Sequence, residues 1–140
     1  MKIRKAKEKD IRSMVDLVIN EFAKPPYNDK WTRREALNSI KADMKKGESY
    51  VAEEKNEIIG FIIITKEKID KVYIFIENLV VDENYQRKNI GRSLVEKVEN
   101  RYKKEVITLS VNKKSQAYKF YKKLGYIENK NNVNMSKKLK

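Results

Sequence analysis

The chain has 140 residues, contains neither cysteine nor histidine, and carries a formal net charge of +13. It therefore cannot form disulfides, a thiolate metal site, a cysteinyl acyl-enzyme or a histidine-containing triad, so we expect no metal and expect Asp, Glu, Tyr, Lys or water to move protons. It has no apolar run long enough to cross a membrane and no signal peptide, so we expect a cytoplasmic protein without membrane association.

The positive charge is concentrated near the C-terminal end. Residues 111–140 contain nine lysines and one acidic residue, Glu128, so this end alone carries a net charge of +8. A basic face can attract nucleic acid, an anionic membrane or a polyanionic cofactor. We interpret most of the excess as an ordinary solvated surface.

Hydrophobic periodicity in the first half of the chain predicts a strand, two helices and a β-hairpin. Apolar residues at helical spacing mark both helices. The first helix ends before Pro25-Pro26, because a proline disfavours the helical conformation in the residue before it, and Thr32-x-x-Glu35 has the spacing of a capping box that starts the second. In chain order, these elements cover residues 1–5, a stripe from Ile11 to Phe22, the stretch from Thr32 to Gly47, and strands over 49–53 and 57–65.

The loop between these helices, with the residue after it, carries two aromatic side chains, Tyr27 and Trp31. Loops that carry aromatic residues often line binding sites, so both side chains are candidates for a substrate wall. Alternatively, they staple the start of the second helix to the core. The sequence leaves both interpretations open.

The second half of the chain alternates between strand and helix patterns. The predicted elements are a long buried strand over 71–81, a helix from Ile90 to Tyr102, a strand over 105–111, a helix that Gly125 ends, and a final hairpin that pairs Tyr126 and Ile127 with Val133 and Met135. The order of elements predicts an α/β protein with a mixed sheet and helices on both faces, built as a single domain over residues 1–140.

A short basic loop joins the strand 71–81 to the next helix. The first N–H groups of a helix have no intrahelical partner and lie at the positive end of its dipole, so this junction suits an anionic group. Gly91 allows close approach of a ligand to the backbone, and Arg87, Lys88 and Arg92 add positive charge. The pattern predicts a phosphate or pyrophosphate site, although a basic helix start is also common in α/β proteins without one.

Two motifs carry a resemblance to a known family. Gln86-x-x-Asn89-x-Gly91, shortly after Val81, resembles the acyl-CoA pyrophosphate loop of the GCN5-related N-acetyltransferases (GNAT), whose usual form is Gln/Arg-x-x-Gly-x-Gly/Ala. Asn89 stands where the first glycine is usual, and asparagine is the non-glycine residue that best tolerates a positive φ, so the shape of the loop can be kept.

The second motif lies downstream, at the separation usual for the family. The sequence NKKSQAYKFYKKLGY resembles the GNAT pattern of Asn followed by Ala-x-x-Phe-Tyr-x-Lys-x-Gly-Phe/Tyr, with matches at Asn112, Ala117, Phe120, Tyr121, Lys123, Gly125 and Tyr126. The two motifs occur in the family's order, and they cover about half of the chain.

The resemblance implies a GNAT-like fold and an acetyl-CoA site. In this family, the sheet splays open beside a β-bulge in the strand before the loop, acetyl-CoA enters the gap, and its pantetheine arm pairs with the splayed strand. Carried over residue by residue, the resemblance implies cofactor contacts for the end of that strand, the loop and two residues of the second motif, namely Leu79, Val80, Val81, Arg87, Lys88, Asn89, Ile90, Gly91, Arg92, Asn112 and Tyr121.

The implied reaction is acetyl transfer from acetyl-CoA to an amine, and the absence of cysteine favours direct transfer in a ternary complex. Tyr121 is the candidate general acid that protonates the departing thiolate, because a phenol holds a proton at neutral pH. Its alternative role is that of a packed helix aromatic.

Glu77 is the candidate general base, or the group that binds the substrate ammonium. It is one carboxylate inside an apolar run, and partial burial would raise its pKa toward a range useful for a base. The alternative is an ion pair with a lysine at the sheet edge. Tyr73 and Phe75 share its strand face, so we expect them to line the acceptor pocket.

Three functions remain open at this point. The first is an N-acetyltransferase for a small amine or amino sugar. Residues 26–31 and the strand around Glu77 weakly resemble aminoglycoside and amino-sugar acetyltransferases. In such an enzyme, Asp29, Glu35 and Glu77 would make the pocket locally acidic. The second is an acetyltransferase for a peptide amine, either N-terminal or on lysine. The third is a basic nucleic-acid-binding module, but Tyr118, Phe120 and Tyr121 have helical core spacing and do not form a stacking platform. A homodimer is compatible with the family.

Overall fold

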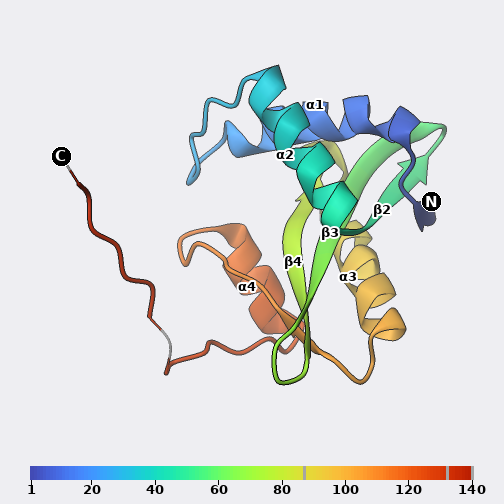
Figure 1. Cartoon of the computed structure of the whole chain (residues 1–140). Coiled ribbons are helices and arrows are strands. Elements are labelled where there is room, and N and C mark those ends of the chain that lie inside the picture. Colours follow the sequence, from blue (N-terminus) through green and yellow to red (C-terminus); the bar gives the residue numbers. More distant parts are fainter. Residues whose placement is uncertain (87, 132, 140) are drawn as a thin grey trace. The chain divides into compact units, whose positions relative to one another are not determined.

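The computed structural model describes residues 1–86, 88–131 and 133–139, and its contacts divide the chain into two compact units, Met1–Ser110 and Val111–Lys140. Each unit is described by itself. In chain order, the first unit contains β1 (Lys2–Lys5), the 3-10 turn η1 (Glu8–Asp10), α1 (Ile11–Phe22), α2 (Arg33–Lys46), β2 (Gly47–Glu54), β3 (Glu57–Lys68), β4 (Val72–Val81), the 3-10 turn η2 (Glu83–Tyr85), α3 (Ile90–Arg101) and β5 (Val106–Thr108) (Figure 1).

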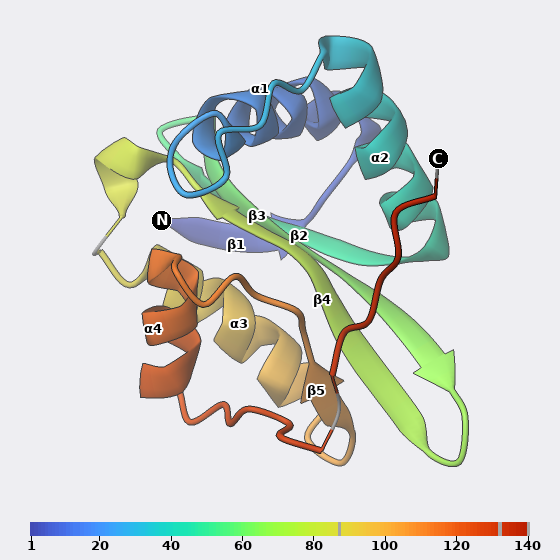
Figure 2. The ribbon, with the colours of Figure 1, turned by 90° about the vertical axis from the view of Figure 1, so that its left-hand side faces the viewer.

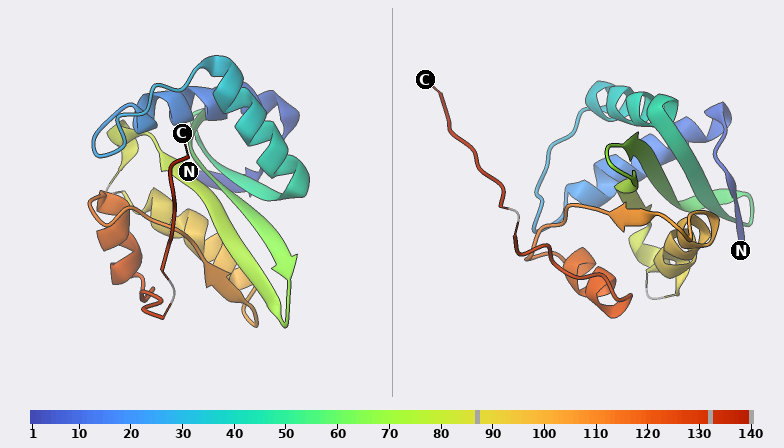
Figure 3. Two further views of the ribbon diagram at one scale, coloured as in Figure 1. Left: turned by 60° about the vertical axis from the view of Figure 1, so that its left-hand side comes forward. Right: turned by 60° about the horizontal axis from the view of Figure 1, so that its bottom comes forward.

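The strands of the first unit form one mixed sheet in the order β1-β2-β3-β4-β5. Neighbouring strands are antiparallel except for β4 and β5, which are parallel. Helices α1 and α2 cover one face of the sheet and α3 covers the other (Figures 2 and 3). The predicted fold class, a mixed sheet with helices on both faces, is therefore confirmed. None of the helices in the described part of the chain combines the length and apolar character needed to span a membrane.

The central strand β3 is buried on both faces, which explains its continuous apolar sequence. Phe61 and Ile63 belong to the core cluster under α1 and α2, which also contains Met14, Val18 and Ile40. Successive side chains of a strand alternate between its faces. The intervening isoleucines of β3, Ile62 and Ile64, are also fully buried and therefore face the α3 side.

Gly47 ends α2, as predicted, but the reason is a close backbone approach. A Cβ atom added to it would lie 1.8 Å from the carbonyl oxygen of Ile64, which belongs to the neighbouring strand. Its φ of −145° is an extended conformation that any residue adopts. Helix α2 can therefore turn directly into β2 only with glycine at this position.

Strand β4 contains the β-bulge expected from the family resemblance. Ile63 pairs with Asn78 while Ile64 pairs with Ile76, so Glu77 is an extra residue with no residue of β3 directly opposite it in the register. On its other side, β4 pairs with β5 only from Tyr73 to Phe75. The sheet is therefore splayed within the first unit: the remainder of β4 continues beyond the end of β5.

An ion-pair network fixes the N-terminal strand to its neighbours. The guanidinium of Arg4 donates two hydrogen bonds of 2.8 and 2.9 Å to the Asp10 carboxylate and also contacts Glu53. Asp10 is 4% exposed and accepts a further bond from the backbone N–H of Lys7. The hydrogen bonds from Arg4 lower the pKa of Asp10 below its usual value, against the opposing effect of burial.

We expect Asp10→Asn to reduce the free energy of unfolding by about 3 kcal/mol at neutral pH, because it removes the charge that balances a half-buried arginine. Since the pKa is lowered by folding, this stabilisation is complete above the unfolded-state value of about 4 and is lost as the pH falls through the lower native value. Urea unfolding of both proteins at several pH values measures the difference. Glu8→Gln, an exposed change in the same turn, is the matched control; an equal loss there would contradict the role of Asp10.

The second unit contains the helix α4 (Gln116–Lys123). Ser115 caps its start by accepting a hydrogen bond from the backbone N–H of Tyr118, and Gly125 follows its end with a φ of +96°, as the sequence predicted for a helix stop. The predicted final hairpin is wrong: the described residues after Gly125 contain no strand. Ile127 and Met135 are each 85% exposed, so the apolar alternation has no face to pack against, and an isolated two-stranded hairpin is marginal in water.

Candidate active site

Within the described part of the first unit, the last residues of β4 present a backbone edge that no strand covers on the side of the splay. The N–H of Asp82 donates to the carbonyl of Ile59 on β3, at 2.8 Å. Because backbone groups alternate between the two edges of an antiparallel strand, those of Val80 also point toward β3, and those of Leu79 and Val81 point away from it. In the first unit, β5 does not reach these two residues. The Val81 carbonyl already accepts the side-chain amide of Gln86 at 2.9 Å, so an extended ligand can pair with the Leu79 groups and with the N–H of Val81.

The loop after β4 has the geometry of an anion site. Asn89 adopts φ 64° and ψ 15°, the left-handed conformation that a glycine takes at low cost, and α3 starts at the next residue, Ile90. Asp82 caps the short turn before it by accepting the N–H of Asn84. The first turn of α3 therefore directs its unpaired N–H groups toward the loop. Arg87, a predicted contact, lies outside the described residues.

The other predicted basic residues of the loop are exposed. The ammonium of Lys88 lies 5.4 Å from the centre of the Tyr85 ring, and the Arg92 guanidinium is 3.1 Å from Glu96, one turn further along α3. Exposed pairs of this kind contribute little stability. Both cations can therefore reorient toward a bound anion at low cost.

The bulge places two polar side chains on the face of the sheet that carries α2. Thr65 donates a hydrogen bond of 2.7 Å from Oγ1 to Oε1 of Glu77, and Asn78 donates one of 3.2 Å from Nδ2 to Oδ2 of Asp43 on α2. Glu77 is exposed, so the expected partial burial is wrong: as the extra residue of the bulge, it lies outside the alternation that buries its neighbours. In the described part of the chain, Thr65 is its partner and no lysine pairs with it.

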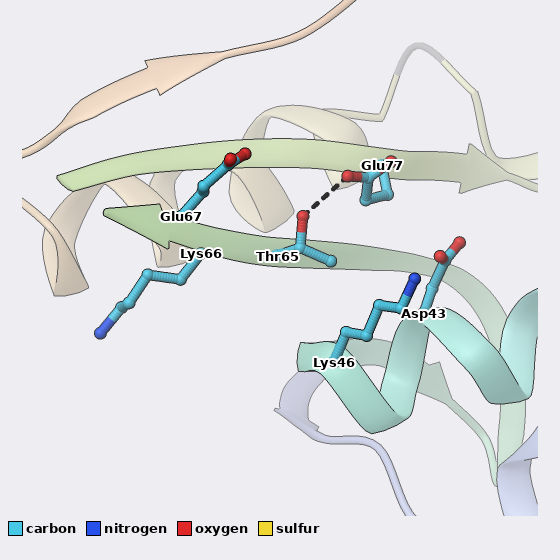
Figure 4. A pocket seen from close by; sticks show the side chains of 6 residues that line it. All are labelled: Asp43, Lys46, Thr65, Lys66, Glu67 and Glu77. Atoms are coloured by element: carbon cyan, nitrogen blue, oxygen red, sulfur yellow. Dashed lines mark hydrogen bonds between the residues drawn. The ribbon is translucent and has the colours of Figure 1, made fainter. Parts of the chain in front are cut away.

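A cavity of about 480 Å³ opens beside the bulge (Figure 4). Helix α2 and strands β3 and β4 line it with three carboxylates, two lysines and a threonine, namely Asp43, Glu67, Glu77, Lys46, Lys66 and Thr65. Burial, and next the charge of Glu77, raise the pKa of Asp43. The lining is thus net negative although the chain is strongly positive, which favours a cationic ligand.

The four aromatic residues predicted to bind substrate do not line this cavity. Trp31 packs against the core under α1 and α2, as the structural alternative predicted, and the ring of Tyr27 meets that of Phe22 edge-on at 4.9 Å. Tyr73 and Phe75 lie opposite residues of β3 that line the cavity, so they share its face, with their ring centres 6.4 Å apart. They flank the cavity without forming its wall.

Asp43 is the main site residue that the sequence analysis missed. It follows Ile40, a buried residue, by three positions, which places a carboxylate near the buried side of a helix. A carboxylate at such a half-buried position of a helix was the sequence signal that could have identified Asp43 as a site residue. Of the three carboxylates expected in the pocket, Glu77 lines the cavity, whereas Asp29 and Glu35 do not. Glu35 instead accepts the N–H of Thr32 in the predicted capping box.

Asn112 and Tyr121 belong to the second unit. The side chain of Asn112 accepts the N–H of Lys114 at 2.8 Å, and its carbonyl accepts that of Ser115, so it shapes the turn that starts α4. The ring of Tyr121 packs edge-on against those of Phe120 and Tyr126, with ring centres 5.1 and 5.4 Å apart. The three aromatic residues of the motif, Phe120, Tyr121 and Tyr126, therefore form one cluster.

Comparison with known proteins identifies the family. The model of the acetyltransferase (GNAT) domain matches residues 16–137, and the chain belongs to this acetyltransferase family. A comparison with curated proteins finds no match.

Solved structures share the fold over nearly the whole chain. PH1933 from Pyrococcus horikoshii OT3 is 27% identical with a TM-score of 0.80, covering 97% of this chain and 92% of its own. A possible acetyltransferase from Clostridium difficile 630 is 24% identical with a TM-score of 0.82, covering 99% and 96%. An aminoglycoside antibiotic 6'-N-acetyltransferase from Acinetobacter haemolyticus is 15% identical with a TM-score of 0.78, covering both chains completely. At 24% and 15% identity, the last two bear on the fold alone.

Proposed function

We propose that this protein is an N-acetyltransferase that transfers the acetyl group of acetyl-CoA directly to the primary amine of a small acceptor, within one cytoplasmic domain spanning residues 1–140. Members of the GNAT family generally use acetyl-CoA as the acyl donor. The observation that carries the proposal is the β4 strand itself: its bulge presents Glu77 to an acidic cavity, and its free edge leads into the loop before α3.

The residues at the end of β4 fit the coenzyme. The outward-facing backbone groups of Leu79 and the N–H of Val81 match the amides of a pantetheine arm, and the first turn of α3, entered through Asn89, matches a pyrophosphate. When bound, acetyl-CoA supplies the acetyl group as an activated thioester. We assign the other proposed contacts with acetyl-CoA, including the one made by Asn112, from the two sequence motifs.

The proposed proton transfers use two side chains. The acceptor amine enters as an ammonium ion and must lose a proton before it can attack a carbonyl carbon, and Glu77 accepts that proton directly or through water. The departing sulfur needs a proton, which the phenol of Tyr121 donates. The role of Tyr121 rests on its place in the second motif.

A small amine is the acceptor that the cavity supports. Its volume of about 480 Å³ lies within the range of small-molecule sites. Its carboxylates would hold a cationic acceptor that the rest of the surface repels. The fold shared with an aminoglycoside acetyltransferase is compatible with this class of acceptor.

The direct test is an acetylation assay that follows CoA thiol release. The protein is incubated with acetyl-CoA and either a diamine, an amino sugar, an aminoglycoside or a lysine-containing peptide. We expect release with one or more of the small cationic amines. Release with the peptide alone would replace the proposed acceptor class, and no release above the amine-free background with any of them would count against the proposed activity.

A further inference from the structure

The carboxylate of Glu21, in the last turn of α1, accepts hydrogen bonds from both ends of the turn that follows β4. Its Oε2 accepts the backbone N–H of Glu83 at 3.2 Å, and its Oε1 accepts the side-chain amide of Gln86 at the same distance. Glu83 and Gln86 are 62 and 65 residues away along the chain. Both carboxylate oxygens are therefore used to hold one loop.

The bond from Gln86 extends this arrangement to the strand. The same amide nitrogen also donates to the carbonyl of Val81, at 2.9 Å. Val81 is the last residue of β4, and its backbone faces the free edge. Glu21 and Gln86 together therefore fix the direction in which the chain leaves the strand, up to Gln86.

A third contact ties Glu21 to the loop on the other side. The ammonium of Lys24 lies 2.9 Å from Glu21 and 2.8 Å from Glu83. Lys24 also begins the turn that carries Tyr27, because its carbonyl accepts the N–H groups of Tyr27 and Asn28. The Glu21 side chain is 15% exposed, whereas its partners Lys24 and Glu83 are 37% and 60% exposed, so the carboxylate is the least solvated member of this group.

We propose that Glu21 is a positioning residue for acetyl-CoA: it holds the β4–α3 loop in the conformation that receives the pyrophosphate. This inference rests on the proposed function. A carboxylate near a phosphate site repels the phosphate, so electrostatics alone would favour its removal. If Glu21 acts only through its charge, removing that charge strengthens the binding of acetyl-CoA. If Glu21 positions the loop, removing the charge weakens the binding.

The test compares two isosteric variants of α1 by calorimetric titration with acetyl-CoA. Glu21→Gln replaces one carboxylate oxygen by an N–H₂ group, so it cannot accept hydrogen bonds from both the Glu83 N–H and the Gln86 amide. Asp16→Asn is the control: it makes the same change in charge on the same helix, at an exposed residue paired with Arg33. We expect Glu21→Gln to weaken binding about tenfold, since charge-assisted hydrogen bonds are lost. Asp16→Asn should bind as wild type or slightly more tightly.

Equal or tighter binding by Glu21→Gln would overturn the inference, because charge would then be the only effect of this residue. If wild type itself does not bind acetyl-CoA, the proposed function fails instead. In the acetylation assay, the variant should raise KM for acetyl-CoA and leave kcat at saturation unchanged, which a simple loss of folded protein cannot do. If Glu21→Gln does not fold, Gln86→Met replaces it, because it removes the amide that joins Glu21 to Val81 without changing the charge. Weaker binding of acetyl-CoA is then the expected result, and wild-type affinity would overturn the inference.

Discussion

Tyr121→Phe is expected to lower kcat by about 100-fold while leaving the affinity for acetyl-CoA nearly unchanged, because it removes one hydroxyl and keeps the ring. The phenol is proposed to protonate the departing thiolate, and general acids typically contribute at least this factor. Its ring contacts with Phe120 and Tyr126 do not require the hydroxyl, so the second unit should stay folded. Steady-state kinetics and calorimetric titration measure the two quantities.

Tyr118→Phe is the matched control, since it makes the same chemical change on the same helix. Tyr118 lies under the ammonium of Lys122 and is assigned no part in the reaction. We expect its kcat to equal that of wild type. If Tyr121→Phe also kept wild-type turnover, the proton donor would have to be another group, and Tyr121 would be a packing residue.

Glu77→Gln is expected to lower kcat at neutral pH by about 100-fold and to flatten the acidic limb of the pH–rate profile. The amide cannot accept the proton of the acceptor, so the rate no longer depends on ionisation of this group. Thr65 can still donate to the remaining carbonyl oxygen, which keeps the local geometry. The measurement is kcat as a function of pH for both proteins.

Glu67→Gln provides the control, because it removes one negative charge from the same cavity at a residue outside the bulge. It should weaken binding of a cationic acceptor and leave the shape of the profile unchanged. A Glu77→Gln profile that retained its acidic limb would leave water or the substrate as the proton acceptor. Because the charge of Glu77 contributes to the raised pKa of Asp43, that pKa should fall in Glu77→Gln, which NMR titration can detect.

Local sequence patterns predicted the helices and the interior strands well because the periodicity and capping signals of each element lie within a short stretch of consecutive residues. Thr32 and Glu35 form the predicted capping box, and the apolar run over 71–81 forms β4, an interior strand between β3 and β5. The final hairpin failed because local alternation does not show whether a strand will have a partner. Ile127 and Met135 have the right spacing and remain exposed.

The candidate site was predictable only in part because it depends on contacts between distant segments. The bulge was anticipated through the family resemblance, but its effect on Glu77, which it moves out to solvent, was not. Asp43 contacts Asn78, 35 residues further along the chain, and Glu21 contacts Glu83 in the turn after β4, 62 residues further along. Neither contact can be inferred from the sequence, because the two residues of each pair belong to segments far apart along the chain.

Calorimetric titration of the wild-type protein with acetyl-CoA at moderate salt tests the central claim most directly. The free edge of Leu79 and Val81, the left-handed Asn89 and the first turn of α3 are proposed to form one coenzyme site. We expect saturable one-to-one binding that persists when salt is raised, because the pantetheine contacts are not ionic. Absence of binding would contradict the claim, would point to Asn89 as a disabling change in the loop, and would make nucleic acid the next ligand to test.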